Sequence, residues 1–388
     1  MQLPNFIASL RRRATVGRVN KLRTVDSLSL RQFQQDVRMA AEPVAVRGLV
    51  RDWPAVRAAV AGDQALADYL TEKATPDKIW FIDGPPEIEG RFHYNGDGSG
   101  LNFTRNELPL SIFLKKLLTA ANDKRPHTLA AQGVDIANTM PRFAAENPMP
   151  LLDPSIAPKA WIGNNTRVAA HHDSQENVVC VVAGKRRFTL FAPEQLANLY
   201  IGPFHFTPAG VAVSMVDFAA PDFKRYPRFR EALKNSMVFD LEPGDALYIP
   251  YHWYHHVQAF GPITMLVNYW WNDTSRVGGS PWDALMHGLM ALRSLPFDQR
   301  RAWHAMFEHY VFLLNGDPGE HLAPAARGIL AATGDTDLKD MRRKLIENLG
   351  RENYGSCDKV VEPTAKIEQA NPTRASYSLN VRYGQSSL

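Results

Sequence analysis

Short β-forming segments separated by turn residues constrain the fold of this chain more than any other feature. Residues 177–182 are mostly β-branched and are followed by a glycine, so we expect a buried strand running into a hairpin, with residues 187–191 returning as its partner. Residues 242–245 (Glu-Pro-Gly-Asp) predict a turn into a short apolar strand at 246–250, and residues 263–271 predict a last strand. The pattern predicts a mainly β fold with flanking helices, whose core is a small double-sheet jelly roll that can enclose one site.

Three residues of metal-binding types lie at the ends of these predicted strands, namely His171, Asp173 and, much later in the chain, His255. Side chains alternate sides along a strand, so His171 and Asp173 can bind one ion together while His172 faces elsewhere. Two imidazoles and one carboxylate leave open positions on an octahedral metal, which is typical of non-haem Fe(II) oxygenases. A His-x-Asp pair by itself also occurs by chance in many proteins. The strand pattern around it and the distant histidine favour a metal site.

The order of the motifs resembles that of one known enzyme family. The motifs are His171-x-Asp173-x-x-x-Asn177, Gly184-Lys185-Arg186-Arg187, Pro243-Gly244-Asp245-x-x-Tyr248-Ile249-Pro250, His255-His256 and Asn268-Tyr269-Trp270. They are similar to those of the JmjC/cupin-like Fe(II)- and 2-oxoglutarate-dependent dioxygenases, closest in pattern to the asparaginyl hydroxylase that acts on hypoxia-inducible factor. The resemblance implies a double-stranded β-helix, which is the jelly-roll core of that family. It also implies that His171, Asp173 and His255 are the metal ligands and the catalytic centre.

The same resemblance implies a site for the cosubstrate 2-oxoglutarate, whose far carboxylate needs a buried cation because an unpaired buried carboxylate is very costly. The family usually has a lysine where this chain has Arg186, and a guanidinium can hold a carboxylate through two parallel hydrogen bonds. Lys185 is the alternative, since a bulge at the glycine would exchange the two side chains, and either could instead be a solvated strand residue. Thr128 is a candidate for a helping hydroxyl. Asn177 and Asn268 match positions near the cosubstrate, although either could be an ordinary strand asparagine.

The resemblance implies that the protein uses Fe(II), 2-oxoglutarate and O2 to hydroxylate a side chain of a protein or peptide. A small molecule or an RNA base is the alternative substrate, because substrate choice resides in loops that the pattern does not explain. N-methyl demethylation by the same hydroxylation step ranks lower. A different class of function is also open, namely a metal-binding cupin without enzymatic activity, and the arginine at position 186 is the feature that favours it.

Composition is that of a globular protein and limits where it acts. The chain has 388 residues, only two cysteines and a net charge of +4, which is too small to indicate nucleic acid as a partner. No run approaches the ~20 apolar residues of a membrane helix, and Cys180 lies in a predicted core strand, so we expect a reducing, cytoplasmic location without a membrane. Residues 1–25 are rich in arginine and contain no acidic residue, and this composition also fits a mitochondrial transit peptide.

Changes in periodicity predict four regions. Residues 1–25 form a basic arm, and residues 26–275 form the catalytic domain, with its core barrel at about 128–272. Ser29 predicts the N-cap of a helix at 30–41. Residues 281–350 are helical, with apolar side chains three and four apart, and residues 351–388 form a polar tail. The helical region is either a lid on its own domain or a module for homodimerisation, as in related hydroxylases that pair through C-terminal helices.

Overall fold

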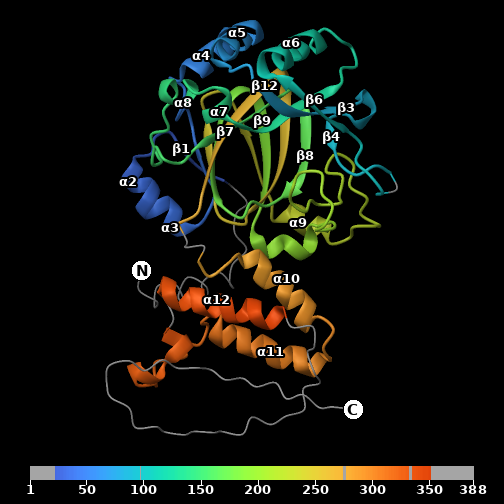
Figure 1. Ribbon diagram of the computed structural model, residues 1–388. Helices are drawn as coiled ribbons and strands as arrows, with labels where there is room; N and C mark the ends of the chain where they lie inside the picture. Colours follow the sequence, from blue (N-terminus) through green and yellow to red (C-terminus); the bar gives the residue numbers. More distant parts are fainter. Residues whose placement is uncertain (1–21, 97, 274–276, 332–333, 351–388) are drawn as a thin grey trace. The chain divides into compact units, whose positions relative to one another are not determined.

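The computed structural model describes residues 22–96, 98–273, 277–331 and 334–350, which fall into two compact units (Figure 1). One unit runs from Arg18 to Asn272, and the described residues of the other begin at Asp273. Most of the predicted basic arm and all of the predicted polar tail lie outside the described residues. Within the described ranges, no helix has both the length and the apolar character needed to cross a bilayer.

The first unit is built on strands that join in one hydrogen-bonded network. Five of the described strands come early in the chain, before the region that we predicted as the core barrel. The strands are β1 (Arg23–Val25), β2 (Val44–Val46), β3 (Lys78–Gly84), β4 (Arg91–Phe92), β5 (Thr104–Pro109), β6 (Thr128–Asp135), β7 (Pro158–Gly163), β8 (Thr166–His171), β9 (Glu176–Phe191), β10 (Met237–Leu241), β11 (Ala246–Ile249) and β12 (Tyr254–Trp271).

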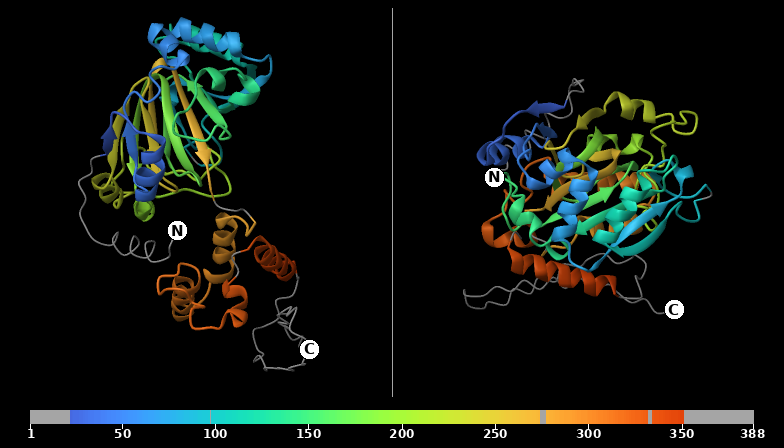
Figure 2. Two further views of the ribbon diagram at one scale, coloured as in Figure 1. Left: turned by 90° about the vertical axis from the view of Figure 1, so that its left-hand side faces the viewer. Right: turned by 90° about the horizontal axis from the view of Figure 1, so that it is seen from above.

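The long strands β9 and β12 pair antiparallel, and each takes part in two sheets. The first half of β9 pairs with β11 and its second half with β10. The first half of β12 pairs with β8, and its second half with β7. A long sheet of order β1-β2-β11-β9-β12-β7-β6-β3-β5 is thereby joined to a short one containing β10, β9, β12, β8 and β4 (Figure 2). This arrangement is the predicted jelly roll, and the mainly β fold class with flanking helices is confirmed.

The predicted hairpin at Gly184 is wrong, because residues 177–182 and 187–191 belong to the single strand β9. Gly184 has a φ of +67°, which favours glycine. A Cβ at this position would lie 2.7 Å from Cγ2 of Thr264 and 2.8 Å from the carbonyl oxygen of Phe260, both on β12. The glycine therefore lets two bent strands approach each other closely and does not reverse the chain.

The other predictions from turn residues and caps are confirmed. The turn at residues 242–245 forms, with the Asp245 N–H donating to the Glu242 carbonyl over 3.0 Å and Gly244 at a φ of 97°. The predicted strand at 263–271 exists as the second half of β12. Ser29 caps a helical segment that ends at Ala40, and its side chain and that of Gln32 form a capping box.

Helices flank the sheets of the first unit, and Figure 1 shows α4, α5 and α6 gathered at one end of it. The helical elements are α2 (Leu30–Gln32), the π-helical turn η1 (Phe33–Val37), α3 (Arg38–Ala40), α4 (Pro54–Ala61), α5 (Asp63–Lys73), η2 (Pro86–Ile88), α6 (Leu110–Ala120), α7 (Ile136–Thr139), α8 (Phe143–Glu146), η3 (Pro193–Asn198) and α9 (Phe229–Lys234).

Alternation along β9 separates two hydrophobic cores. Val178, Cys180 and Val182 pack with apolar residues of α4, α5 and α6 on the outer face of the long sheet. Val179 and Val181 face the other way and pack with residues of the short sheet, of β2 and of β11. This second core fills the space between the two sheets, where the predicted site residues also lie.

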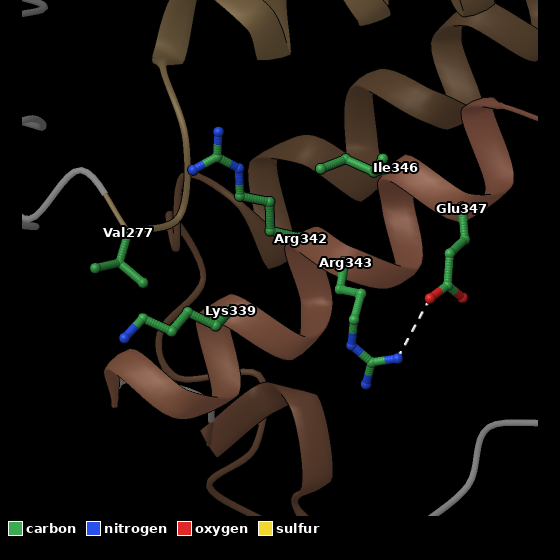
Figure 3. Close-up of a pocket in the computed structure, with 6 residues that line it drawn as sticks. All are labelled: Val277, Lys339, Arg342, Arg343, Ile346 and Glu347. Carbon is green, nitrogen blue, oxygen red and sulfur yellow. Dashed lines mark hydrogen bonds and ion pairs between the residues drawn. The ribbon is translucent and has the colours of Figure 1, made fainter.

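The second unit is helical and contains α10 (Pro281–Leu292), α11 (Phe297–Tyr310), η4 (Pro324–Ala326), η5 (Gly328–Ala331) and α12 (Asp335–Leu349). None of the residues of α10, α11 and α12 is buried. A hollow of about 530 Å³ lies along α12, and Arg343 in its lining pairs with Glu347 at 3.3 Å (Figure 3). The lining residues are Val277, Lys339, Arg342, Arg343, Ile346 and Glu347. Among the described residues, its lining contains no histidine or cysteine.

Candidate metal centre

The three predicted ligands converge between the two sheets. His171 ends β8 and is the register partner of His255, the second residue of β12, and their ring centroids are 4.4 Å apart. Asp173 lies two residues beyond the end of β8, in the following loop and not on the strand as the alternation argument assumed. One ligand atom from each residue lies within 4.8 Å of the others. Among the described residues, this is the one group of three or more such side chains close enough to hold an ion.

Backbone carbonyls orient both imidazoles of this triad. Nδ1 of His171 lies 2.9 Å from the Ala169 carbonyl oxygen, and Nδ1 of His255 lies 3.1 Å from that of Trp253. A carbonyl can only accept, so each Nδ1 carries the hydrogen and each Nε2 keeps its lone pair. Burial lowers the pKa of His255 to about 4, which makes this imidazole neutral at physiological pH. The two Nε2 atoms are therefore prepared as metal ligands.

The carboxylate of Asp173 is held by two donors. Nδ2 of Asn177 donates to its Oδ2 over 3.1 Å, and Nε1 of Trp270 donates to the same atom over 3.0 Å. Burial by itself raises the pKa of Asp173, but the facing imidazoles and these hydrogen bonds outweigh it and hold the pKa below its usual range. Asp173 is thus an anion next to two imidazoles, and this donor set fits a divalent ion of the Fe(II) type.

The histidines adjacent in sequence to the ligands have other surroundings. The ring of His172 packs against those of His252 and Tyr254, with centroid separations of 4.2 Å and 5.0 Å, so His172 does face away from the triad. His256 stacks on Phe218 at 4.2 Å. His252 has a φ of 61° and donates its N–H to the Asp173 carbonyl over 3.3 Å, which ties the two ligand-bearing loops together.

Arg186 and Lys185 point in different directions. Arg186 is buried, with Nη2 donating to the Thr264 hydroxyl over 3.2 Å and to the Trp161 carbonyl over 3.4 Å, while its Nε has no hydrogen-bond partner. Burial lowers its pKa to about 10, which still leaves it charged at neutral pH. Lys185 is half exposed and pairs with Glu242 at 3.5 Å. Within the described ranges, no carboxylate forms an ion pair with Arg186, so this cation suits an anionic ligand from outside the chain.

Asn177 and Asn268 are both buried and lie in the same interior as the triad. The Asn268 Nδ2 donates to Oδ1 of Asn177 over 3.4 Å, and Trp161 donates its indole N–H to the Asn268 Oδ1 over 2.8 Å. The sequence analysis overlooked Trp161. It also overlooked Thr264, although that residue lies on β12 an even number of positions before Asn268 and therefore on the same face.

Thr128 is buried at the start of β6 and lines a different cavity of about 570 Å³. The other residues of that cavity are Pro86, Glu87, Glu89, Gly90, Arg125, Pro126, His127, Asn164 and Asn165. Neither Arg186 nor any of the three ligands belongs to this lining. The role of Thr128 in binding the cosubstrate therefore stays a prediction.

Comparison with known proteins supports this description. The chain is 36% identical to human HSPB1-associated protein 1 over 112 residues, which are 28% of this chain and 22% of that protein. It is 32% identical to the lysine-specific demethylase JMJ31 of Arabidopsis thaliana over 114 residues, 29% of this chain and 20% of the other. The chain thus spans about a fifth of the length of these two relatives. It is 22% identical to the tRNA wybutosine-synthesizing protein 5 of Gallus gallus over 268 residues, 64% of this chain and 76% of that protein.

The sequence profile of one family covers most of the first unit. This profile, described as a cupin-like domain, matches residues 30–276, which is well over half of the chain and includes all three ligands. The chain therefore belongs to the cupin-like domain family of the JmjC type, in agreement with the resemblance drawn from its motifs.

Proposed function

We propose that the protein is an Fe(II)- and 2-oxoglutarate-dependent oxygenase that hydroxylates a side chain of a protein or peptide. Its family is of the Fe(II)/2-oxoglutarate oxygenase type. The observation that carries the proposal is the convergence of His171, Asp173 and His255 to within 4.8 Å inside the jelly roll. Two neutral nitrogen ligands and one carboxylate on one side of an ion leave the opposite positions free for cosubstrate and O2.

The chain's own residues hold and balance the reacting groups. When bound, Fe(II), 2-oxoglutarate and O2 supply the oxidising chemistry, and the protein supplies position and charge compensation. Arg186 would hold the far carboxylate of 2-oxoglutarate through its unused Nε and its Nη atoms. The two positive charges of the ion, less one negative charge of Asp173 and two of the cosubstrate, leave one negative charge for Arg186 to balance. Asn177 and Asn268, which are buried in the same interior as the triad, would lie near the cosubstrate's other end.

The apolar side chains between the sheets complete this environment. Val179 and Val181 of β9 and Leu266 of β12 line the same interior as the buried asparagines. They exclude water, which strengthens the interaction of Arg186 with a carboxylate and protects the reaction from solvent.

An anaerobic titration tests the cosubstrate site. Adding 2-oxoglutarate to the Fe(II)-loaded protein should produce the weak visible charge-transfer band of that chelate, and admitting air should yield succinate. Arg186→Ala should weaken 2-oxoglutarate binding about thirtyfold or more, because it removes one partner of a buried charge pair. Lys185→Ala is the matched control, since Lys185 is half exposed and pairs with Glu242, and it should bind as wild type. A missing band together with no succinate would favour a metal-binding cupin without enzymatic activity.

A second substrate class has support of its own. The relative with the broadest coverage among those compared is named for tRNA wybutosine synthesis, so an RNA base is the alternative to a protein side chain. The two are distinguished by mass spectrometry of host proteins and host tRNA from cells with and without the gene. A gain of one oxygen atom that depends on the gene should occur on protein. If the gain occurs on tRNA alone, the substrate class proposed here is wrong while the oxygenase assignment stands.

A further inference from the structure

We propose that Trp161 is a positioning residue that fixes the orientation of the Asp173 carboxylate through two intervening asparagines. The contacts form a chain from Trp161 Nε1 to Asn268 Oδ1 at 2.8 Å, from Asn268 Nδ2 to Asn177 Oδ1 at 3.4 Å, and from Asn177 Nδ2 to Asp173 Oδ2 at 3.1 Å. Three of these residues come from adjacent strands in the order β7, β12 and β9. The chain therefore runs across the long sheet to the metal centre.

The chemistry of the two ends determines the direction of every bond in this chain. An indole N–H can only donate, so it requires the oxygen of Asn268 and turns that amide's NH2 group toward Asn177. The ionised Asp173 carboxylate can only accept, so it requires the NH2 group of Asn177 and turns the oxygen of that amide toward Asn268. Both ends thus require that the Asn268 NH2 group donates to the Asn177 oxygen, which is the longest of the three hydrogen bonds. Removing the indole N–H leaves the Asn268 oxygen without its donor, so both amides are then oriented from the Asp173 end alone.

Burial makes this constraint effective. Asn177 is 3% exposed and Asn268 is 1% exposed, so water has little access to replace a missing partner. A buried polar group that loses its partner bears its full desolvation cost, and hydrogen bonds in a chain reinforce one another in a low-dielectric interior. A change at Trp161 should therefore alter the orientation of the Asp173 carboxylate, although two other side chains lie between these residues.

Trp270 is the second residue that orients the Asp173 carboxylate. Its indole N–H donates to the same Oδ2 atom as Asn177, so both of the side-chain hydrogen bonds described for this carboxylate end on one oxygen. Oδ2 also lies 3.7 Å from Nε2 of His255, so the two donors hold the carboxylate oxygen that faces this ligand histidine. The ring of Trp161 meets that of Trp270 edge to face at 5.9 Å, so Trp161 also contacts the second donor.

The inference rests on the proposed metal centre, and metal affinity tests it without turnover. Co(II) is titrated into the metal-free protein and its visible absorption is followed. Trp161→Phe keeps an aromatic ring against Trp270 but removes the N–H, and it should weaken Co(II) binding about tenfold, as the loss of a partner behind a metal ligand typically does. Trp53→Phe is the matched control, because Trp53 is buried in the other core and donates its N–H to the Pro148 carbonyl over 2.8 Å. It should leave Co(II) affinity unchanged.

A second variant tests whether the residues act in series. Asn268→Leu interrupts the chain at its next link, and the double variant with Trp161→Phe should bind Co(II) no more weakly than Asn268→Leu does. Independent packing effects would add instead, so additive losses would refute the proposal even if one variant were poorly folded. Wild-type affinity in Trp161→Phe, or an equal loss in Trp53→Phe, would also refute it. If the wild-type protein takes up no Co(II), the proposed metal centre itself is refuted. That result is distinct from a refutation of the role of Trp161 in the series of hydrogen bonds.

Discussion

Helices of the two units carry similar apolar stripes but bury them to very different degrees. On α6, Leu110, Phe113, Leu114 and Leu117 are at most 1% exposed, because they pack into the core outside the long sheet. On α11, Trp303 is 44% exposed and Met306 is 46% exposed, although their spacing of three residues is also that of one helix face. Periodicity therefore predicts an apolar face but not what covers it.

The first unit thus buries its own apolar surface, whereas the helices of the second unit leave theirs exposed. The first unit has five buried hydrophobic clusters and a site between its sheets, whereas α10, α11 and α12 contain no buried residue. Contiguous exposed apolar side chains are rare on monomers and commonly mark interaction sites. The same kind of substitution should therefore have different consequences in the two units, and three comparisons test this.

The largest expected difference concerns chemistry. Asp173→Ala removes the anionic ligand, so we expect the protein to lose Fe(II) on desalting and to produce no succinate above background. Asp340→Ala makes the same change on α12, where the carboxylate is 60% exposed and pairs with Arg343 at 3.1 Å, and it should retain both properties. Metal content and succinate formation are measured on both variants. Iron retention at the wild-type level by Asp173→Ala would refute the assignment of this ligand.

The next difference concerns stability. Phe113→Ala creates a cavity in the core beneath α6 and should lower the free energy of unfolding by about 3–5 kcal/mol. Phe297→Ala changes a side chain that is 70% exposed at the start of α11 and should alter it by no more than about 0.5 kcal/mol. Urea unfolding followed by intrinsic fluorescence measures both variants at a protein concentration low enough to limit self-association. Equal losses would mean that the two units are not as different as their burial indicates.

What sequence could predict follows from which interactions are local. The metal ligands were found because His171 and Asp173 are close in the chain and follow a strand pattern, and the cap at Ser29 was found because its partner is three residues away. The turn at 242–245 depends on its own proline and glycine. In each of these cases at least two of the residues that make the feature are neighbours in the sequence, whereas the distant His255 was identified by its place after the predicted strand at 246–250.

The features that were missed depend on neighbours from other strands. The prediction of a hairpin at Gly184 is wrong because its close contact with Phe260 and Thr264 of β12 cannot be predicted from the neighbouring sequence. The choice between Arg186 and Lys185 stayed open for the same reason, since it depends on how β9 bends at that glycine. Trp161 reaches Asn268 only because β7 and β12 are adjacent in the sheet.

The last comparison concerns assembly, for which the sequence analysis left a lid and a homodimer as alternatives. If a second copy covers the helices, removing apolar side chains from α11 should weaken the dimer, since tryptophan commonly contributes 2 kcal/mol or more, about thirtyfold in Kd, at an interface. We expect the full chain to sediment as a dimer and the double variant Trp303→Gln, Met306→Gln to dissociate at higher concentration. The variant Arg301→Gln, Glu308→Gln changes one exposed and one partly exposed position of the same helix and should remain dimeric. Analytical ultracentrifugation over a range of concentrations measures all three proteins. A wild-type chain that stays monomeric at high concentration would favour the lid, and the exposed stripe on α11 would then be covered within one chain.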